Sequence, residues 1–302
     1  MKRWLAVVSK ISASKLMAAI GVLTFIVGAI SVFYSITLFL ANSSIPGGPS
    51  DLHASQWSGY LAASDVQNRS PVVSSVSGSW VVPEVNASEN MTFSGIWVGI
   101  GGYGEETLIQ TGTEQEYFNG KPVYYAWYEL LPDYLVQIPR ILVQPGDKMT
   151  ASISLVNEAE STWSIMISDV TRGTHFEKTV VYNSSRLSAE WIVERPKVNG
   201  TVSTLADFGT ATFTDCKATI DGVTGVIGNF SYARLVMHEE DTPLVSVSPL
   251  TSDDSGFTVN YLETLSPTPS AIEFTQTVVV QSSWPPTKTA VSQKTFRVAD
   301  GI

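Results

Sequence analysis

The sequence predicts an all-β fold, a sandwich of two large antiparallel sheets preceded by one N-terminal transmembrane helix. From Trp57 onward, short β-branched and aromatic runs alternate with turn signals at the spacing typical of β-sandwiches. Beyond the N-terminal segment, no long stretch shows the period of an amphipathic helix. Two facing antiparallel sheets bury such a pattern, and all-β domains of about 200–250 residues commonly stay single.

The N-terminus carries the signals of a membrane anchor. Residues 1–15 form a flank whose charges are all basic, and an uncharged run follows over residues 16–40. About 25 such residues suffice to cross a bilayer and exceed the 7–15 of a signal-peptide core. The basic flank places the N-terminus inside the cell and the remainder outside. We therefore expect a single-pass protein of the cell membrane, or a secreted protein if the segment is cleaved near Ala41.

The rest of the chain divides into three parts. Residues 41–55 are rich in Pro, Gly and Ser without apolar periodicity, which predicts a linker. The sandwich is expected over residues 56–262, and a C-terminal β extension over 263–302. Triplets that could accept a glycan agree weakly with an extracellular glycoprotein, and they begin at Asn42, Asn68, Asn86, Asn90, Asn183, Asn199 and Asn229.

Strands are predicted from β-branched and aromatic runs bounded by turns. Within the sandwich the clearest strands are Ser79–Pro83, Val123–Leu130, Thr150–Leu155 and Trp163–Ser168. In the C-terminal extension, Thr275–Val280 and Lys294–Val298 are two further strand candidates, which could form a hairpin packed on the domain or belong to a partly mobile extension.

The composition excludes several functional classes. Charged residues make up 15% of the chain and the net charge is −10, so no basic patch is available for nucleic acid. The single cysteine, Cys216, lies in an alternating strand pattern and is expected to be a small buried residue. The three histidines lie in unrelated contexts without ligand spacing. We expect a monomer with no metal and no organic cofactor.

Two stretches combine strand character with one polar group each. Gln110 lies in Leu108–Gly112, and Glu190 lies in Ala189–Glu194. A carboxylate can take a proton from water while an amide N–H supports the oxyanion on an attacked carbonyl.

Strand alternation places Glu114 on the face of Gln110, and Ile192 and Glu194 on the face of Glu190. Tyr125, Trp127 and Glu129 share one face of a third strand. If these faces line the concave side of a sheet, they form one groove with an amide, carboxylates and aromatic residues.

Two neighbours of Glu190 in the same strand are not expected to take part in catalysis. Trp191 points to the opposite face and is predicted to be a core residue. Glu194 lies about 13 Å further along an ideal strand, too far to share a proton with Glu190. We therefore expect Glu194 at the rim of the groove.

An ordered set of motifs resembles the eqolisin family of glutamic endopeptidases. The resemblance covers about residues 56–262 and rests on Trp57-Ser-Gly-Tyr60, Gly78-Ser-Trp-Val-Val-Pro83, Trp97-Val-Gly-Ile100, Gln110-Thr-Gly112, Tyr125-Ala-Trp-Tyr-Glu129 with Pro132-Asp-Tyr134, Ala189-Glu-Trp-Ile-Val-Glu194 and Asp207-Phe-Gly-Thr210. It implies the same two-sheet fold and protein or peptide substrates.

The resemblance also implies a Gln/Glu dyad. Glu190 would be the general base and then the general acid, while Gln110 would position the water and stabilise the oxyanion. Trp97, Trp127 and Glu129 match positions that line the family's cleft. The substrate-binding set is completed by Tyr125, Glu114 and Ile192.

Two positions depart from the fungal members of the family. Gly101 stands where they commonly carry an acidic residue, and Tyr125 stands where they carry an aspartate. Both changes affect the polar surroundings of the dyad and leave the dyad itself intact. A carboxylate with a pKa near the reference of about 4.3 can serve as base and acid only in an acidic medium. We therefore expect an acid endopeptidase.

Two other functions use the same features. A β-sandwich glycoside hydrolase needs two carboxyl groups about 5–9.5 Å apart, which Glu190 could form with Glu129 or Glu114. A non-catalytic, surface-tethered carbohydrate-binding protein would use the aromatic residues alone.

Overall fold

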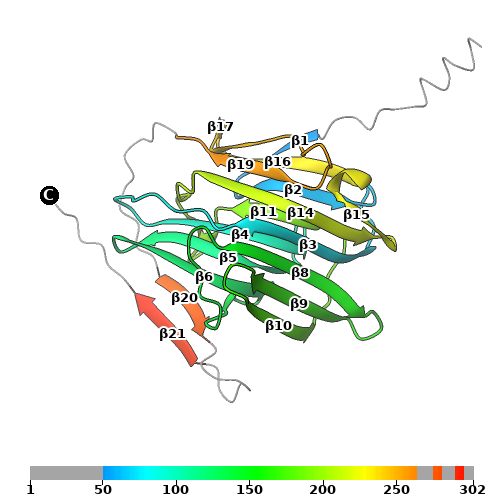
Figure 1. The fold of residues 1–302 in the computed structure, drawn as a ribbon, viewed down its shortest axis with the longest axis horizontal. Helices are drawn as coiled ribbons and strands as arrows, with labels where there is room; N and C mark the ends of the chain where they lie inside the picture. The colour runs from blue at the N-terminus through cyan, green and yellow to red at the C-terminus, as the bar shows by residue number, and fades with distance from the viewer. Residues whose placement is uncertain (1–49, 264–274, 281–289, 296–302) are drawn as a thin grey trace, which may run out of the picture. The chain divides into compact units, whose positions relative to one another are not determined.

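The computed structural model describes residues 50–263, 275–280 and 290–295. In this part of the chain the strands form an 11-stranded sheet, an 8-stranded sheet and one small hairpin (Figure 1). The only helix among these residues is a 3₁₀ turn, η1 (Ile227–Asn229). The two large sheets confirm the predicted all-β sandwich.

The predicted transmembrane segment, residues 16–40, lies outside the described residues, as does the basic flank before it. Within the described ranges, no helix has the length and apolar character needed to span a membrane.

The 11-stranded sheet carries the candidate site. Its order is β1 (Ser50–Ala54), β16 (Ser231–Glu239), β2 (Trp57–Ala63), β11 (Ala189–Glu194), β4 (Thr92–Gly101), β5 (Leu108–Phe118), β6 (Lys121–Leu130), β7 (Val136–Gln137), β20 (Thr275–Val280) and β21 (Ala290–Thr295), with β17 (Thr242–Pro243) paired to β16. Most pairs are antiparallel, but β1 with β16 and β20 with β7 are parallel.

The 8-stranded sheet covers one face of the first. Its order is β10 (Thr174–Val181), β9 (Thr162–Asp169), β8 (Lys148–Asn157), β3 (Val73–Val81), β14 (Thr210–Ile220), β19 (Phe257–Tyr261) and β18 (Val245–Val247), with β15 (Val223–Val226) paired to β14. The hairpin joins β12 (Lys197–Val198) to β13 (Thr201–Val202). The four strands predicted within the sandwich fall on β3, β6, β8 and β9.

Large aromatic side chains fill the core between the sheets. Trp191 on β11 is 0% exposed, and its Nε1 donates to the Ser77 carbonyl of the facing sheet at 2.7 Å. Trp80 on β3 donates in the opposite direction, to Thr113 Oγ1 at 2.9 Å. Both rings therefore bury apolar surface with their polar atoms satisfied. The expected core positions of Trp191 and of the free thiol Cys216 are confirmed.

The other face of the 11-stranded sheet has an apolar cluster of its own. Its buried members are Leu61, Trp97, Leu108, Tyr125, Trp127, Ile192, Ala233 and Leu235. Successive strand residues point to opposite faces, so the central strands are apolar on both sides. All ten residues of β4 are buried for this reason. Four members of this cluster, Leu108, Tyr125, Trp127 and Leu235, also line a cavity on this face of the sheet.

The two ends of the described chain differ from expectation. The linker predicted over 41–55 is wrong at its C-terminal end, because Ser50–Ala54 form β1. An edge strand is held by main-chain hydrogen bonds and needs no apolar period, and Asp51 also pairs with Arg234 at 2.7 Å. In the C-terminal extension the first predicted strand is confirmed as β20. The second begins four residues earlier than predicted, at Ala290.

Candidate active site

Gln110 and Glu190 lie in one row across the central strands. Glu190 on β11 is opposite Gly99 on β4, and Gly99 is opposite Gln110 on β5. Directly paired residues share a face, and two inter-strand spacings place the Gln110 and Glu190 Cα atoms about 9.5 Å apart. The structure thus brings the predicted pair together, with a residue that has no side chain between them.

Gly99 keeps this row open. A Cβ atom at Gly99 would lie 2.8 Å from Trp97 Cζ3 and 3.0 Å from Leu108 Cδ1. Both distances are shorter than ordinary carbon contacts of about 3.5–4.0 Å. Any larger residue would therefore displace the side chains that border the amide and the carboxyl group.

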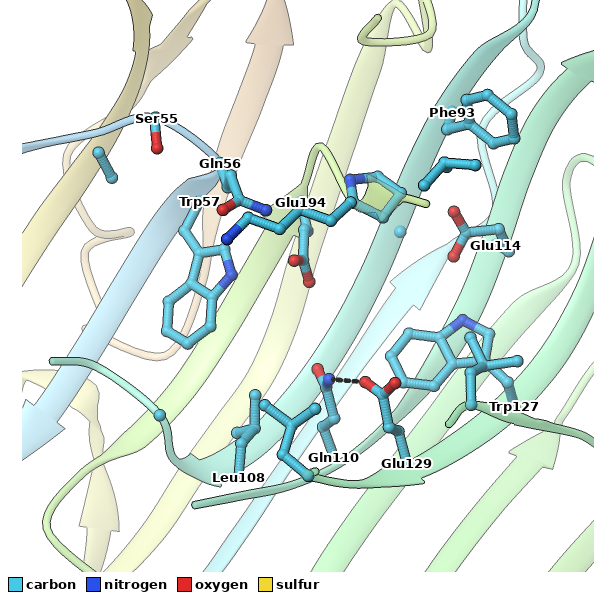
Figure 2. A pocket seen from close by; sticks show the side chains of 18 of the residues that line it. Ser55, Gln56, Trp57, Phe93, Leu108, Gln110, Glu114, Trp127, Glu129 and Glu194 are labelled. Carbon is cyan, nitrogen blue, oxygen red and sulfur yellow. Dashed lines mark hydrogen bonds between the residues drawn. The ribbon is translucent and has the colours of Figure 1, made fainter. Parts of the chain in front are cut away.

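Gln110 is held from its other side by Glu129. The row continues onto β6, where Glu129 is paired with Gln110. Gln110 Nε2 donates to Glu129 Oε2 at 2.6 Å (Figure 2). This contact fixes the amide with its nitrogen toward Glu129 and its oxygen turned away.

Three polar atoms of the dyad are buried without a hydrogen-bond partner among the described residues. They are both carboxyl oxygens of Glu190 and the Oε1 atom of Gln110. Glu190 is 0% exposed and Gln110 is 3% exposed. An unsatisfied buried polar atom costs about 1–3 kcal/mol, and more when it is charged. Such atoms are rare in folded proteins and mark this row as a site where polar chemistry is favoured over stability.

Burial raises the pKa of Glu190 well above its usual value. The Ser188 hydroxyl and the Gly101 N–H lie near the carboxyl group without forming a hydrogen bond of normal geometry. They oppose this rise together with the Arg69 charge, while the Glu105 charge adds to it. The sequence-based premise of a pKa near the reference value is therefore wrong for this conformation. The reason is desolvation, which strand alternation does not reveal.

A cavity of about 930 Å³ lies over the row. Of the predicted substrate-binding residues, Glu114, Tyr125, Trp127 and Glu129 line it. Trp97 and Ile192 do not line it; they are fully buried in the apolar cluster on this face of the sheet. Glu190 is shielded from solvent as well, whereas Gln110 reaches the cavity surface.

Glu194 lines the cavity. It lies four residues after Glu190 on the same strand and the same face. It is paired with Gly95, which in turn is paired with Glu114. Trp97 Nε1 donates to Glu194 Oε2 at 2.8 Å. Glu194 is partly exposed and lies on the same cavity as Gln110 (Figure 2), so its expected place at the rim stays a prediction.

The carboxyl groups of the cavity have raised pKa values. Burial raises the pKa of Glu194 to about 7, against the hydrogen bond from Trp97. Burial, and then the Glu194 charge, raise the pKa of Glu129 to about 7. Burial and the charges of Glu116, Glu194 and Glu129 raise the pKa of Glu114 well above its usual value. In acidic solution these groups are neutral.

Several cavity residues had no predicted role. Trp57 lines the cavity and meets Trp97 edge-on, with ring centroids 5.0 Å apart. Its motif was recognised, but only the pairing of β2 with β11 places it beside Glu194. The chain from His53 to Gln56 and the β12–β13 hairpin also reach the cavity. Nothing local in the sequence indicates these long-range approaches.

Gly101 has a backbone that explains one departure from the fungal pattern. Its φ is 87°, and a Cβ atom there would lie 2.6 Å from the Thr107 carbonyl oxygen. An acidic side chain at this position would require a different path of the chain after β4. Across the described ranges, no group of three or more His, Cys, Asp or Glu residues is arranged to hold a metal ion.

The model of the peptidase A4 family matches residues 55–261. The chain belongs to the peptidase A4 family. Aspergillopepsin-2 from Aspergillus niger is 29% identical over 240 residues, which cover 72% of this chain and 80% of that protein. Scytalidopepsin B from Scytalidium lignicola is 28% identical over 167 residues, covering 51% and 62%.

Solved A4-family structures share the fold. Scytalido-glutamic peptidase with a transition state analog inhibitor superposes with a TM-score of 0.58 at 23% identity, over 69% of this chain and 98% of that chain. Aspergilloglutamic peptidase from Aspergillus niger gives a TM-score of 0.51 at 29% identity, over 57% and 99%. The predicted eqolisin membership is confirmed, and this A4-family protein is a peptide-bond hydrolase that acts on proteins or peptides.

Proposed function

We propose that the protein is an endopeptidase that uses Gln110 and Glu190 as its catalytic dyad. One observation carries the proposal: both carboxyl oxygens of Glu190 and the Oε1 atom of Gln110 are buried without a hydrogen-bond partner among the described residues. The two residues lie in one row across the sheet, with only Gly99 between them. A water molecule and a substrate carbonyl would supply the missing partners. The family membership of the chain supports the same reading.

The proposed reaction needs one titrating group. The Glu190 carboxylate takes a proton from water as the water oxygen attacks the scissile carbonyl carbon. Gln110 donates an N–H to the oxyanion that forms on that carbon. Glu190 then gives its proton to the leaving nitrogen as the C–N bond breaks. The products are a carboxyl group and an amine, and Glu190 returns to its carboxylate form.

The cavity suits an extended peptide. Trp127 and Tyr125 offer aromatic walls for side chains, while Glu114 and Glu129 offer polar groups. Trp97 and Ile192 would support this surface from below. The substrate-binding roles of these six residues are part of the proposal.

The raised pKa of Glu190 sets the expected low-pH limb of activity. Because the base must be ionised, kcat/KM should rise with pH through the raised pKa of Glu190. The acid optimum expected from sequence stays a prediction, and it now requires a second group that must be neutral.

Two substitutions test the dyad. Gln110→Ala should lower kcat by about 10²–10³ fold, the usual cost of losing an oxyanion donor. Glu190→Gln should lower it by at least about 10²–10⁴ fold, since no general base remains. Matched controls are Gln67→Ala and Glu177→Gln, which change exposed residues. Protein digestion at the wild-type rate by both dyad variants, with unfolding midpoints unchanged, would contradict the proposal.

We also propose that residues 16–40 display the domain outside the cell. The basic flank and the uncharged run that follows it support this topology. The full-length protein should remain in the membrane fraction after alkaline carbonate extraction and should digest substrate added outside intact cells. Recovery from the medium of a chain that starts near Ala41 would contradict the anchor and show that the protein is secreted after cleavage.

A further inference from the structure

Glu129 contacts the side-chain amide of Gln110, which the dyad mechanism needs in one orientation. Its Oε2 atom accepts from Gln110 Nε2 at 2.6 Å, and the Gln110 Oε1 atom is left buried and unpaired (Figure 2). An ionised Glu129 can only accept hydrogen bonds, so it holds the amide nitrogen. One of the two amide N–H bonds is then used by Glu129, and the side turned away from Glu129 presents Oε1, which repels an oxyanion and leaves a single N–H to stabilise it.

A neutral Glu129 allows the opposite arrangement. A protonated carboxyl group has one O–H to donate, and the Gln110 Oε1 atom is an acceptor. Rotation of the terminal amide by about 180° exchanges its oxygen and nitrogen, and this torsion has two roughly equivalent minima. The Glu129 O–H then donates to Gln110 Oε1, and both amide N–H bonds point away from Glu129.

We propose that Glu129 is a positioning residue whose protonation turns the Gln110 amide, so that its N–H groups face the scissile bond. The inference rests on the proposed dyad and adds the rule that Glu129 must be neutral in the active enzyme. Activity is then expected only where Glu190 is ionised while Glu129 is neutral. Glu190 sets the low-pH limb and Glu129 sets the high-pH limb.

The surroundings of Glu129 favour its neutral form. Burial and the Glu194 charge raise the pKa of Glu129 to about 7, against hydrogen bonds from Gln110 and the Leu135 backbone. The other titratable groups that face it are Glu114 on β5 and the Tyr182 hydroxyl, which donates to the Leu131 carbonyl. The charges of Glu194 and Glu114 both repel a charge on Glu129. This repulsion becomes stronger when bound substrate excludes water from the cavity, because the local dielectric constant falls.

The test is the pH profile of kcat/KM for the full-length protein with a peptide substrate. The wild type should lose activity about tenfold per pH unit above the ionisation of Glu129. Glu129→Gln keeps a donor beside Gln110 and cannot ionise, so its profile should lose this fall. Glu129→Leu cannot orient the amide and should lower kcat by up to about 100-fold across the profile, with KM changed much less.

A control separates Glu129 from its acidic neighbour. The pKa of Glu194 is also raised to about 7, yet no hydrogen bond joins it to Gln110. Glu194→Gln should therefore keep the fall but move it to lower pH, because the Glu194 charge no longer raises the pKa of Glu129. A fall that persists at the same pH in Glu129→Gln, or that disappears in Glu194→Gln, would overturn the inference.

The outcome is distinct from failure of the dyad. If Gln110→Ala keeps wild-type activity, the dyad itself is wrong. If the dyad variants are inactive and Glu129→Gln has the wild-type profile, only the role of Glu129 is wrong. Should Glu129→Leu not fold, the profile of Glu129→Gln decides alone.

Discussion

Raising the pH from 4 to 8 should destabilise the folded protein through Glu129 and Glu194. Each has a pKa raised from 4.5 to about 7 in the folded state. The folded state therefore holds protons that the unfolded chain has already released. The stability from these groups is complete below about pH 4.5 and is lost as the pH rises through about 7.

The size of the loss follows from the two pKa values. A rise from 4.5 to about 7 corresponds to about 3 kcal/mol for each group. The charge of Glu194 is itself one cause of the rise at Glu129, so the two contributions overlap. Both groups border the cavity, where solvent screening reduces the effect. The expected loss is about 3 kcal/mol in total, a large part of a typical stability of about 5–15 kcal/mol.

Urea unfolding followed by tryptophan fluorescence at pH 4, 6 and 8 measures this loss. Glu129→Gln and Glu194→Gln should each flatten the dependence of the unfolding free energy on pH. The exposed Glu177→Gln should leave it unchanged. A free energy that is constant or rises between pH 5 and 8, or glutamine variants with the wild-type slope, would refute the reasoning.

Three further outcomes are expected. Gly99→Ala should lower kcat by about 100-fold with a smaller change in KM, because the added Cβ atom displaces Trp97 and Leu108 beside the dyad. Unchanged kinetics would contradict the claim that Gly99 keeps the space between Gln110 and Glu190 open. Trp97→Phe removes the donor to Glu194 and should cost about 1.5–3 kcal/mol of unfolding free energy above pH 7, and less in acid where Glu194 is neutral. Cys216 should react with a thiol reagent only after unfolding, since it is fully buried and burial raises its pKa; rapid labelling of the native protein would contradict this.

Strand alternation predicted much of the site from sequence. It placed Gln110 and Glu190 on the faces of two strands that point away from the inter-sheet core and sent Trp191 into that core, as the structure has it. Alternation is a local property with a period of two, so it can be read without knowing which strands pair.

The remaining features depend on long-range pairing and burial. Glu194 lines the cavity because β11 lies between β2 and β4, and Trp97 on β4 donates to it. The raised pKa of Glu190 follows from complete burial, which no single strand determines. Strand β1 forms because β16 offers a free edge, and main-chain pairing of this kind leaves no apolar period to recognise.

A double-mutant cycle tests most directly whether Gln110 and Glu190 act as one unit. The measurement is kcat/KM of the wild type, Gln110→Ala, Glu190→Gln and the double variant on one peptide at one pH. Residues that serve the same step are strongly non-additive. We predict that the double variant is no slower than Glu190→Gln alone by more than about threefold. Losses that multiply fully in the double variant would show that the two side chains act independently and would contradict the dyad.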